Sequence, residues 1–486
     1  MQPNVRLAIL AALALLLVAC FSSPFQDDDA WWLLTTGQYI VHNHKLPVPD
    51  PFAFTTYIGK PEPTRNFQLT HQWLADAMLY LAYAAGGFPV VVWLRAVLMA
   101  AACGLAGLVA RRRSGNFFAA VAAVLICAAI AYRFAGDQPA IVTFFGVAAA
   151  MAMAEDRRWR WAVPLLFLIW ANCDDGFWLG WIALAFCCVE ARRRQMWIVA
   201  ALSVLACGIN PNGFYWSALP LWPAAPLVAL AAGYIRSLTV AARIRAARVS
   251  KRFLQWALAA AIMAVAALPV WQKRAFQFSA WEATRPLGAV KFLTAHHTGG
   301  LLFNTEEDGG YLMWHLWPRA RVFADGRRLN RAVLQDYRRI LYSRVTPGEK
   351  NVFQLLDQYG VQAIVTTAYD YPTGSPHFLI AMLADPNQTQ WKLVYQDGQA
   401  MVFLRQAPPG VKALPNIAAL SSMEAQCAAH IRLVPGEPLC ARETCKIYEH
   451  LGNVLRARFW MAYYLEHKKA PDPAAETEYQ RLIRNK

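Results

Sequence analysis

The feature that most constrains this chain is a series of apolar stretches separated by short clusters of arginine. A helix needs roughly 17 to 25 predominantly apolar residues to cross the hydrocarbon layer of a bilayer. Stretches near this length, several of them short, lie at approximately residues 5–23, 88–110, 116–134, 139–154, 161–174, 176–190, 196–210, 217–235 and 253–271. The pattern therefore predicts an α-helical polytopic membrane domain with about nine transmembrane helices.

The composition agrees with a membrane protein and argues against binding to nucleic acid. Apolar residues make up 57% of the 486 positions and charged residues only 16%, which is unusual for a soluble domain. The net charge of +16 comes from arginines in short clusters between apolar stretches, and no single basic face is predicted. We therefore interpret the charge as a topology signal and expect no nucleic-acid partner.

The arginine clusters also predict the orientation of the chain. They occupy the breaks at 111–113, 157–160, 192–194 and 236–252, which by the positive-inside rule face the cytoplasm together with the N-terminus. The alternate breaks are acidic or rich in Asn and Gly, at 27–29, 136–139, 172–176 and 210–213. These should face outward, and the chain should leave the membrane near residue 271 on the same outer side.

Three domains are expected from these patterns. Residues 1–271 form the transmembrane domain, with a long first outer loop at 25–87 in which the residues after 70 form an apolar helix ending at 86–87. Residues 272–410 show short strands alternating with helical patterns, which predict a small external α/β domain. Its strand candidates are 300–304, 321–327, 361–367 and a hairpin of 391–395 with 400–404, turning at Asp397-Gly398. Residues 411–486 form a C-terminal helical extension, with 447–466 as one half of a helical hairpin.

An acidic triplet at the predicted outer surface is the first candidate for an active site. Asp27, Asp28 and Asp29 follow the first apolar stretch and lead directly into Trp31 and Trp32. Crowded carboxylates repel one another, so they suit sites that bind a cation, accept a proton or contact a polar substrate. The simpler alternative is that they mark the outside of a span or cap the N-terminus of the helix that carries the tryptophans.

Other polar residues of the outer loops have similar alternatives. Asp174 and Asp175 are candidates for substrate binding or for an ordinary polar turn between helices. His71 either contacts a phosphate or orients a helix, and Arg133 either contacts a phosphate or extends to the interface from a helix end. Arg285, just beyond the last span, is a further candidate. For the turn at 325–327 a structural salt bridge is the favoured interpretation.

Several of these segments carry a resemblance to a known family. The order Asp27-Asp28-Asp29-Ala30-Trp31-Trp32, the Pro-Asp-Pro-Phe at 49–52, the outer loops at 170–180 and 210–213, and the segment 323–327 resemble bacterial polytopic membrane proteins of the GT-C glycosyltransferase superfamily. Members of this family begin with an Asp-x-Asp-x-Trp-Trp element after the first span. The chain departs from the family at Leu33 and at Asp174-Asp175, where the family carries histidines.

The resemblance implies a membrane glycosyltransferase that uses a polyprenyl-phosphate sugar donor. Transfer with inversion needs a carboxylate that takes the proton of the acceptor hydroxyl, and Asp27 or Asp29 is expected in that role. Asp28, Trp31, Trp32, His71, Arg133, Asp174, Asp175 and Arg285 are the expected substrate-binding residues. No cofactor is certain; Mg²⁺ or Mn²⁺ held by Asp27 and Asp29 is an option. The expected acceptor is a glycan, lipid or protein at the outer face of the bacterial cytoplasmic membrane.

Two other functions remain open at this point. One is a catalytically silent membrane assembly protein that holds a partner with its external domain. The other is a lipid or polysaccharide transporter, which predicts ionisable residues deep within the spans, where Arg95 is among the few. Cys427, Cys440 and Cys445 lie in the predicted external part, and two of them can form a disulfide.

Overall fold

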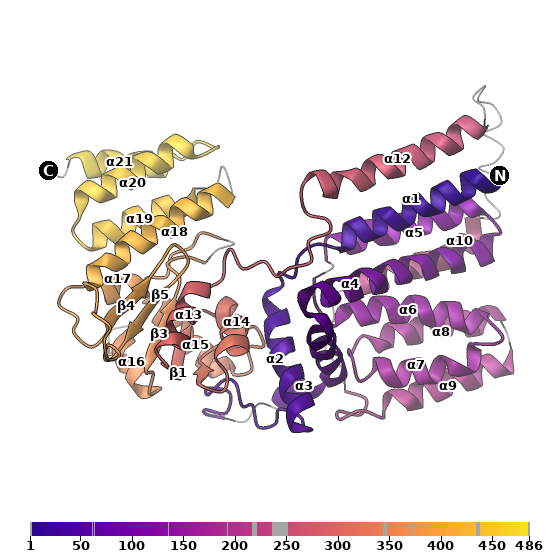
Figure 1. Ribbon diagram of the computed structural model, residues 1–486, viewed down its shortest axis with the longest axis horizontal. Helices are drawn as coiled ribbons and strands as arrows, with labels where there is room; N and C mark the ends of the chain where they lie inside the picture. Colours follow the sequence, from indigo (N-terminus) through magenta and orange to yellow (C-terminus); the bar gives the residue numbers. More distant parts are fainter. Residues whose placement is uncertain are drawn as a thin grey trace. The chain divides into compact units, whose positions relative to one another are not determined.

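The chain forms two compact units in the computed structural model (Figure 1). Unit 1 contains Met1–Val48 and Asn66–Trp281, and unit 2 contains Pro49–Arg65 and Glu282–Lys486. The structure describes all residues except 1, 61, 63, 135, 192, 216–220, 236–250, 344–347, 371–372, 434–437 and 485–486. The start of the predicted span 217–235 and Arg236, Arg243, Arg245 and Arg248 of the fourth arginine cluster lie outside the described residues.

Unit 1 is a bundle of helices. Its elements are α1 (Pro3–Phe21), α2 (Asp28–Asn43), α3 (Arg65–Thr70), α4 (Trp73–Ser114), α5 (Phe117–Tyr132), α6 (Ala140–Glu155), η1 (Arg160–Ala162), α7 (Val163–Trp170), α8 (Phe177–Ala191), α9 (Arg194–Cys207), η2 (Trp222–Leu227), α10 (Val228–Ile235) and α12 (Lys251–Trp271). Most of these helices run side by side, whereas α2 crosses the bundle at one end (Figure 1). Each predicted apolar stretch thus contains helix in its described part.

Only part of the prediction of nine spans is supported by helix length. Within the described residues, Pro3–Phe21 and Arg65–Ser114 are long and apolar enough to cross a membrane. The other apolar helical segments have 10–17 described residues, among them Gln255–Trp271 of α12, which is at or below the lower limit for a span. Nine spans are therefore not confirmed.

Helix α4 contains a sharp break at Gly86 and Gly87. Gly87 has φ 68° and ψ −159°, a backbone conformation that a residue with a Cβ atom rarely adopts. Pro89 follows two residues later and has no N–H to continue the hydrogen-bond ladder. The break separates the first part of α4 from the long apolar part, as the Gly-Gly pair predicted.

Helix α2 packs very closely against the first part of α4. A Cβ atom added at Gly37 of α2 would lie 2.0 Å from the carbonyl oxygen of Asp76. Such a contact is impossible for a larger residue, so Gly37 sets the distance between the two helices. The same contact holds the start of α2, with its aspartates, in a fixed place in unit 1.

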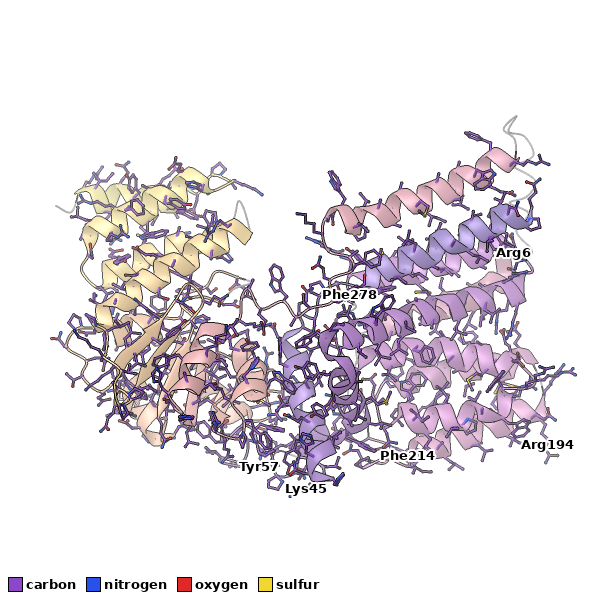
Figure 2. The ribbon with its side chains drawn as sticks, in the orientation of Figure 1. Arg6, Lys45, Tyr57, Arg194, Phe214 and Phe278 are labelled. Atoms are coloured by element: carbon purple, nitrogen blue, oxygen red, sulfur yellow. A yellow bond between two sulfur atoms is a disulfide. The ribbon has the colours of Figure 1, made fainter. Side chains whose placement is uncertain are left out.

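The arginine-rich loops lie together at one end of unit 1. Arg113 forms ion pairs of 2.6 Å with both Glu155 and Glu190, and Arg112 forms one of 3.2 Å with Asp156. These contacts join the C-terminal ends of α4, α6 and α8. Figure 2 shows Arg6 and Arg194 at this end, with Lys45 and Phe214 at the opposite end of the same unit.

Unit 2 contains a five-stranded sheet with strand order β2-β1-β3-β5-β4. The strands are β1 (Gly300–Asn304), β2 (Ala320–Val322), β3 (Ala363–Thr366), β4 (Lys392–Gln396) and β5 (Met401–Leu404). β1 pairs in parallel with β2 and β3, whereas β5 pairs antiparallel with β3 and β4. The hairpin at Asp397-Gly398 and the strand at 300–304 are confirmed, whereas β3 covers only the middle of 361–367 and β2 ends at Val322, before the turn that completes 321–327. Helices α13 (Leu287–Ala295), α14 (Glu306–Leu316), α15 (Arg331–Leu341), α16 (Val352–Gln358) and α17 (Leu379–Ala384) complete this part.

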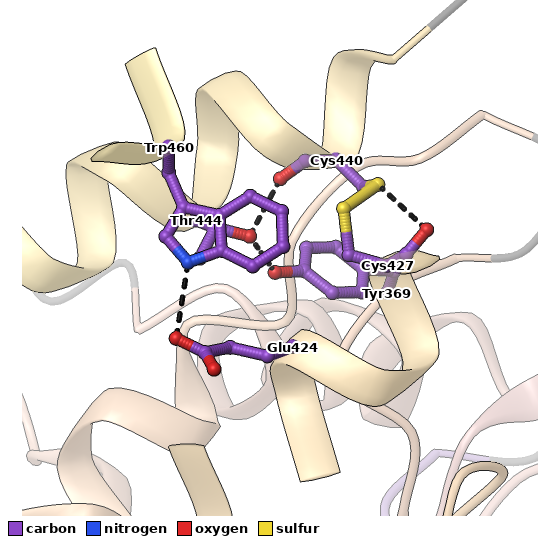
Figure 3. Close-up of a disulfide and its surroundings, with 6 residues drawn as sticks. All are labelled: Tyr369, Glu424, Cys427, Cys440, Thr444 and Trp460. Carbon is purple, nitrogen blue, oxygen red and sulfur yellow. Dashed lines mark hydrogen bonds between the residues drawn. A yellow bond between two sulfur atoms is a disulfide. The ribbon is translucent and has the colours of Figure 1, made fainter. Parts of the chain in front are cut away.

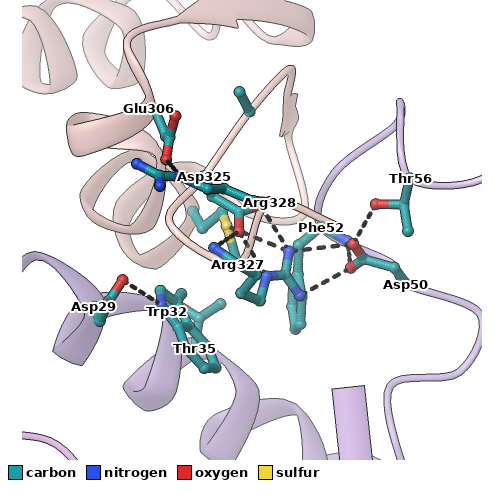
Figure 4. Close-up of polar contacts among 12 residues, drawn as sticks. Asp29, Trp32, Thr35, Asp50, Phe52, Thr56, Glu306, Asp325, Arg327 and Arg328 are labelled. Atoms are coloured by element: carbon teal, nitrogen blue, oxygen red, sulfur yellow. Dashed lines mark hydrogen bonds and ion pairs between the residues drawn. The ribbon is translucent and has the colours of Figure 1, made fainter. Parts of the chain in front are cut away.

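The segment Pro49–Arg65 groups with unit 2, although it lies in the predicted first outer loop. Buried Arg327 binds Asp325 at 2.7 Å and Asp50 at 3.1 Å, so both carboxylates share one guanidinium (Figure 4). The Asp50 carboxylate also accepts a hydrogen bond of 2.6 Å from Thr56. The turn at 325–327 is therefore a structural ion-pair network, as the favoured interpretation predicted.

Four helices close unit 2 after the sheet: α18 (Ala419–Leu433), α19 (Leu439–His450), α20 (Val454–His467) and α21 (Pro473–Arg484). A disulfide joins Cys427 of α18 to Cys440 of α19 (Figure 3), and Cys445 is a buried free thiol. The prediction that 447–466 is one half of a hairpin was wrong. This segment spans the turn between α19 and α20, where Gly452 has φ 75° and interrupts the helical pattern.

Candidate functional site

The acidic triplet forms the N-terminal end of α2. Asp27 is the N-cap residue, and its carboxylate accepts a hydrogen bond of 3.1 Å from the backbone N–H of Asp29. The Asp29 carboxylate in turn accepts a hydrogen bond of 3.0 Å from the indole N–H of Trp32 (Figure 4). Asp28 is exposed, whereas Trp31 is buried against Phe25 and Phe88. The capping alternative is thus confirmed for Asp27, and capping does not exclude a catalytic role.

Asp27 also lies against the loop between α5 and α6. A Cβ atom added at Gly136 would be 2.2 Å from a carboxylate oxygen of Asp27, so only glycine leaves room for this contact. Burial is the main cause that raises the pKa of Asp27 to about 6, and the negative charges of Asp29 and Asp137 act in the same direction. A carboxyl group with this pKa can both lose and accept a proton near neutral pH.

Asp137, in that same loop, is matched by an arginine from α4. Arg95 and Asp137 form a buried ion pair of 2.7 Å. Arg95 also donates to the backbone carbonyls of Phe21 and Ser23 at the end of α1. The Arg95 guanidinium therefore joins α1, α4 and the α5–α6 loop near the acidic triplet. Most of its N–H donors are used in these contacts within unit 1.

A pocket next to this ion pair has apolar walls and a polar end. Its volume is about 80 Å³, and Asp76, Arg95, Asp137 and Gln138 line its polar part. The rest of the lining is almost entirely apolar, from Leu33, Ala75, Met78, Leu79, Val91, Leu94, Leu98, Pro139, Ile141 and Val142. A ligand with a long hydrocarbon part and a polar head suits such a lining.

Asp174 and Asp175 lie in the loop between α7 and α8. Asp174 is buried and accepts hydrogen bonds from the Thr143 hydroxyl and the backbone N–H of Gly176. Burial, followed by the charge of Asp175, raises the pKa of Asp174 to about 7. Cys173 precedes Asp174 in this loop, and its thiol interacts electrostatically with the carboxylates of both Asp174 and Asp76. Asp76 therefore lies between this loop and the amphipathic pocket.

His71 belongs to the same end of unit 1. Its ring stacks on Phe67 with 4.7 Å between centroids, and its Nδ1 donates to the Phe67 carbonyl at 3.1 Å. Burial lowers the pKa of His71, although the nearby charge of Asp175 acts in the opposite direction. A ring held neutral in this way does not supply a positive charge for a phosphate.

The two candidate arginines occupy different environments. Arg133 is exposed at the C-terminal end of α5, four residues before Asp137. Arg285 is buried in unit 2, where it donates to the Glu307 carbonyl at 3.0 Å and lies 3.8 Å from the Asp308 carboxylate. The structure thus brings Asp27, Asp29 and Trp32 together, and His71 near Asp175, but it places Arg285 in the other unit.

Three residues of this site were not singled out as site residues from the sequence: Asp76, Arg95 and Asp137. Arg95 carried a usable signal, because a lone arginine in an apolar stretch requires a counter-charge. Asp137 was a suitable partner in an outer loop, but 42 residues separate it from Arg95. Their pairing follows from the packing of α4 against α6.

The residues present do not form a recognisable metal site. In the described part of the chain, no group of three or more His, Cys, Asp or Glu side chains is placed to hold a metal ion. Asp137, the carboxylate nearest to Asp27 and Asp29 across the loop, is engaged by Arg95. We therefore derive no step through Mg²⁺ or Mn²⁺.

The fold is similar to that of a solved membrane enzyme. The crystal structure of the Archaeoglobus fulgidus oligosaccharyltransferase, in complex with Zn and sulfate, matches with a TM-score of 0.50 and 12% identity over 98% of this chain and 85% of that chain. At this identity the likeness shows a shared fold and not the reaction. No protein-family model matches the sequence, and no curated protein matches it.

Proposed function

We propose that the protein is a membrane glycosyltransferase that moves a sugar from a polyprenyl-phosphate donor to an acceptor hydroxyl at the outer face of the bacterial cytoplasmic membrane. The observation that carries the proposal is the acidic N-terminus of α2 beside an amphipathic pocket in the same unit. The apolar walls suit a polyprenyl chain, and the polar end suits the phosphate sugar. The GT-C type of fold adds support.

Asp27 is the proposed general base. It takes the proton of the acceptor hydroxyl while the acceptor oxygen attacks the anomeric carbon, and the bond from that carbon to the phosphate oxygen breaks. The electron pair of that bond leaves with the lipid phosphate, and a single displacement inverts the anomeric centre. A base with a pKa of about 6 is mostly ionised at pH 7 and still accepts a proton.

Neighbouring residues have supporting roles in this proposal. Asp29 fixes Trp32 through the indole hydrogen bond, so the tryptophan can stack on the sugar in one orientation. Arg133 is the proposed partner of the leaving phosphate, because its side chain is exposed, whereas the hydrogen-bonding groups of Arg95 are already used. Asp174, Asp175 and His71 hold the adjacent loops and complete the polar side of the site.

The location is supported by two independent features. Arg112 and Arg113 join α4, α6 and α8 at one end of unit 1, and α2, which begins at the acidic triplet, lies at the other end (Figure 1), as expected for a protein with its arginines inside. The Cys427–Cys440 disulfide favours an oxidising compartment for unit 2, such as the periplasm or cell exterior.

The test is sugar transfer by the purified protein in lipid nanodiscs with radiolabelled polyprenyl-phosphate hexoses and a panel of membrane-derived acceptors. The matched variant carries both Asp27→Asn and Asp29→Asn. Turnover by the wild type that the variant loses would support the proposal. Absence of turnover with every donor, from folded protein, would contradict it and favour an assembly protein.

A further inference from the structure

A second groove lies at the arginine-rich end of unit 1, between α1, α4 and α5. Its volume is about 410 Å³, and its lining is apolar except for Arg111. Leu13 and Leu17 of α1 and Val121 of α5 form its sides, and Gly104 of α4 leaves its floor open. The lining has no carboxylate and no other charged side chain. The groove therefore suits a hydrocarbon chain with an anionic end at Arg111.

The length of the groove matches one leaflet of a bilayer. Its lining on α4 runs from Ala100 to Arg111, which at 1.5 Å per residue is about 16 Å. The hydrocarbon core of a bilayer is ~30 Å thick, so each leaflet contributes about half of that. Because α1 and α4 are each long and apolar enough to span a membrane, the groove extends from the arginine-rich surface to near the midplane.

The arginines near the mouth of the groove differ in their ion pairs within the described residues. Arg112 and Arg113 are paired with carboxylates of α6, α8 and the loop after α6. Arg111, by contrast, forms no ion pair within the described ranges of the chain, nor does Arg6 of α1. Arg6 lies over the ring of Phe117, 5.6 Å from its centroid, and Phe117 lines the groove. Arg111 therefore lines the groove directly, and Arg6 contacts a ring that lines the same groove.

We propose that this groove binds an anionic glycerophospholipid of the cytoplasmic leaflet, with an acyl chain between α1, α4 and α5 and the headgroup phosphate at Arg111 and Arg6. Arginine binds phosphate through charge-assisted hydrogen bonds, whereas a zwitterionic headgroup offers less net attraction. The sugar donor does not suit this place, because Arg95, beneath the acidic triplet, is 16 residues and about 24 Å along α4 from Arg111.

The experiment is native mass spectrometry of the full-length protein with an equimolar mixture of palmitoyl-oleoyl phosphatidylglycerol and phosphatidylcholine. We expect the wild type to retain phosphatidylglycerol preferentially, and Arg111→Gln to reduce this preference about tenfold. Arg6→Gln should reduce it as well. Arg112→Gln is the matched control, because Arg112 belongs to the same cluster but binds Asp156.

A steric variant tests the groove independently of the charges. A Cβ atom added at Gly104 meets no other atom within 4 Å, so Gly104→Leu fills the groove and should reduce retention of both lipids. Equal retention of phosphatidylglycerol by wild type, Arg111→Gln and Arg112→Gln would overturn the proposal. Displacement of phosphatidylglycerol by undecaprenyl phosphate would also overturn it, because the groove would then belong to a polyprenyl lipid.

Discussion

Both units contain clusters of aspartate and arginine, but the charges are matched in different ways. In unit 2, Arg327 is buried between Asp50 and Asp325, and Thr56 adds a further hydrogen bond to Asp50. In unit 1, Asp27 lies near Asp29 and Asp137, and the nearby guanidinium of Arg95 is already bound to Asp137. In the first cluster the guanidinium binds both carboxylates, whereas in the second Arg95 binds Asp137, and Asp27 is exposed to the negative charges of Asp29 and Asp137.

The two clusters should therefore have different roles, the Arg327 cluster in stability and the Asp27 cluster in the reaction. The ion pairs of Arg327 with Asp50 and Asp325 hold the segment Pro49–Arg65 on unit 2. Removing the arginine would leave two buried carboxylates without their cation. Burial and neighbouring negative charges disfavour the ionised form of Asp27 and so raise its pKa. A raised pKa of this kind is typical of groups that transfer protons. Perturbation of each cluster should therefore affect a different property.

The largest effect is expected at Asp27. Asp27→Asn should lower kcat/KM for sugar transfer by about 10²- to 10⁴-fold, because the amide cannot take up the proton. Asn is as good an N-cap residue as Asp, so α2 should remain folded. Asp156→Asn, which removes a carboxylate paired with Arg112 away from the acidic triplet, is the control for the loss of charge. Near-wild-type transfer by Asp27→Asn would remove Asp27 from the role of base.

A loss of stability without a direct effect on the chemistry is expected at Arg327. Arg327→Met leaves Asp50 and Asp325 buried without their cation and should destabilise unit 2 by about 3–5 kcal/mol. Hydrogen exchange of peptides from β1 and β3, followed by mass spectrometry, measures this effect. Arg321→Met, at an exposed position of β2, should change exchange little. Unchanged protection in Arg327→Met would mean that the network adds nothing to stability.

The Cys427–Cys440 disulfide should contribute less to the stability of unit 2 than the ion pairs of Arg327 do. Replacing both Cys427 and Cys440 by serine removes a disulfide across 13 residues of sequence and should lower the stability of α18 and α19 by about 2–3 kcal/mol. Limited proteolysis of the full-length protein can detect this loss of stability as faster cleavage between α18 and α19. Equal cleavage rates in both proteins would contradict the expectation. The reaction in unit 1 should be unaffected.

The smallest effect is expected at Asp174. The folded pKa of about 7 lies above the ordinary value of 3.8, so the folded protein binds this proton more tightly than the unfolded chain. The stability from Asp174 is therefore present at low pH and is lost as pH rises toward 7. Asp174→Asn keeps an acceptor for Thr143 and should remove this dependence, which between pH 5 and 7 is on the order of 1 kcal/mol per pH unit. Parallel melting curves of both proteins between pH 5 and 8 would contradict it.

The sequence predicted local structure better than long-range contacts. The alternating pattern and the Asp397-Gly398 turn identified the β4–β5 hairpin, and the Gly86-Gly87 pair identified the break in α4. The turn at Gly452 was missed because the apolar pattern continues across it on both sides. Nine spans remained only partly supported, since most apolar helices are shorter than a full crossing.

Contacts between distant segments limited the prediction of the site. The acidic triplet was visible as three consecutive carboxylates, but the pairing of Arg95 with Asp137 depends on how α4 and the α5–α6 loop pack. The assignment of Pro49–Arg65 to unit 2 rests on Asp50 and Arg327, which are 277 positions apart. No local pattern contains that information, because either residue alone resembles an ordinary surface charge.

The most direct test of the central claim is the pH dependence of kcat/KM for sugar transfer by the wild-type protein in nanodiscs. The ionised form of Asp27 is the active base, and its pKa is raised to about 6. The rate should therefore rise with pH and reach half its maximum near pH 6. A rate that stays constant from pH 5 to 8 would contradict the assignment of Asp27 as the base.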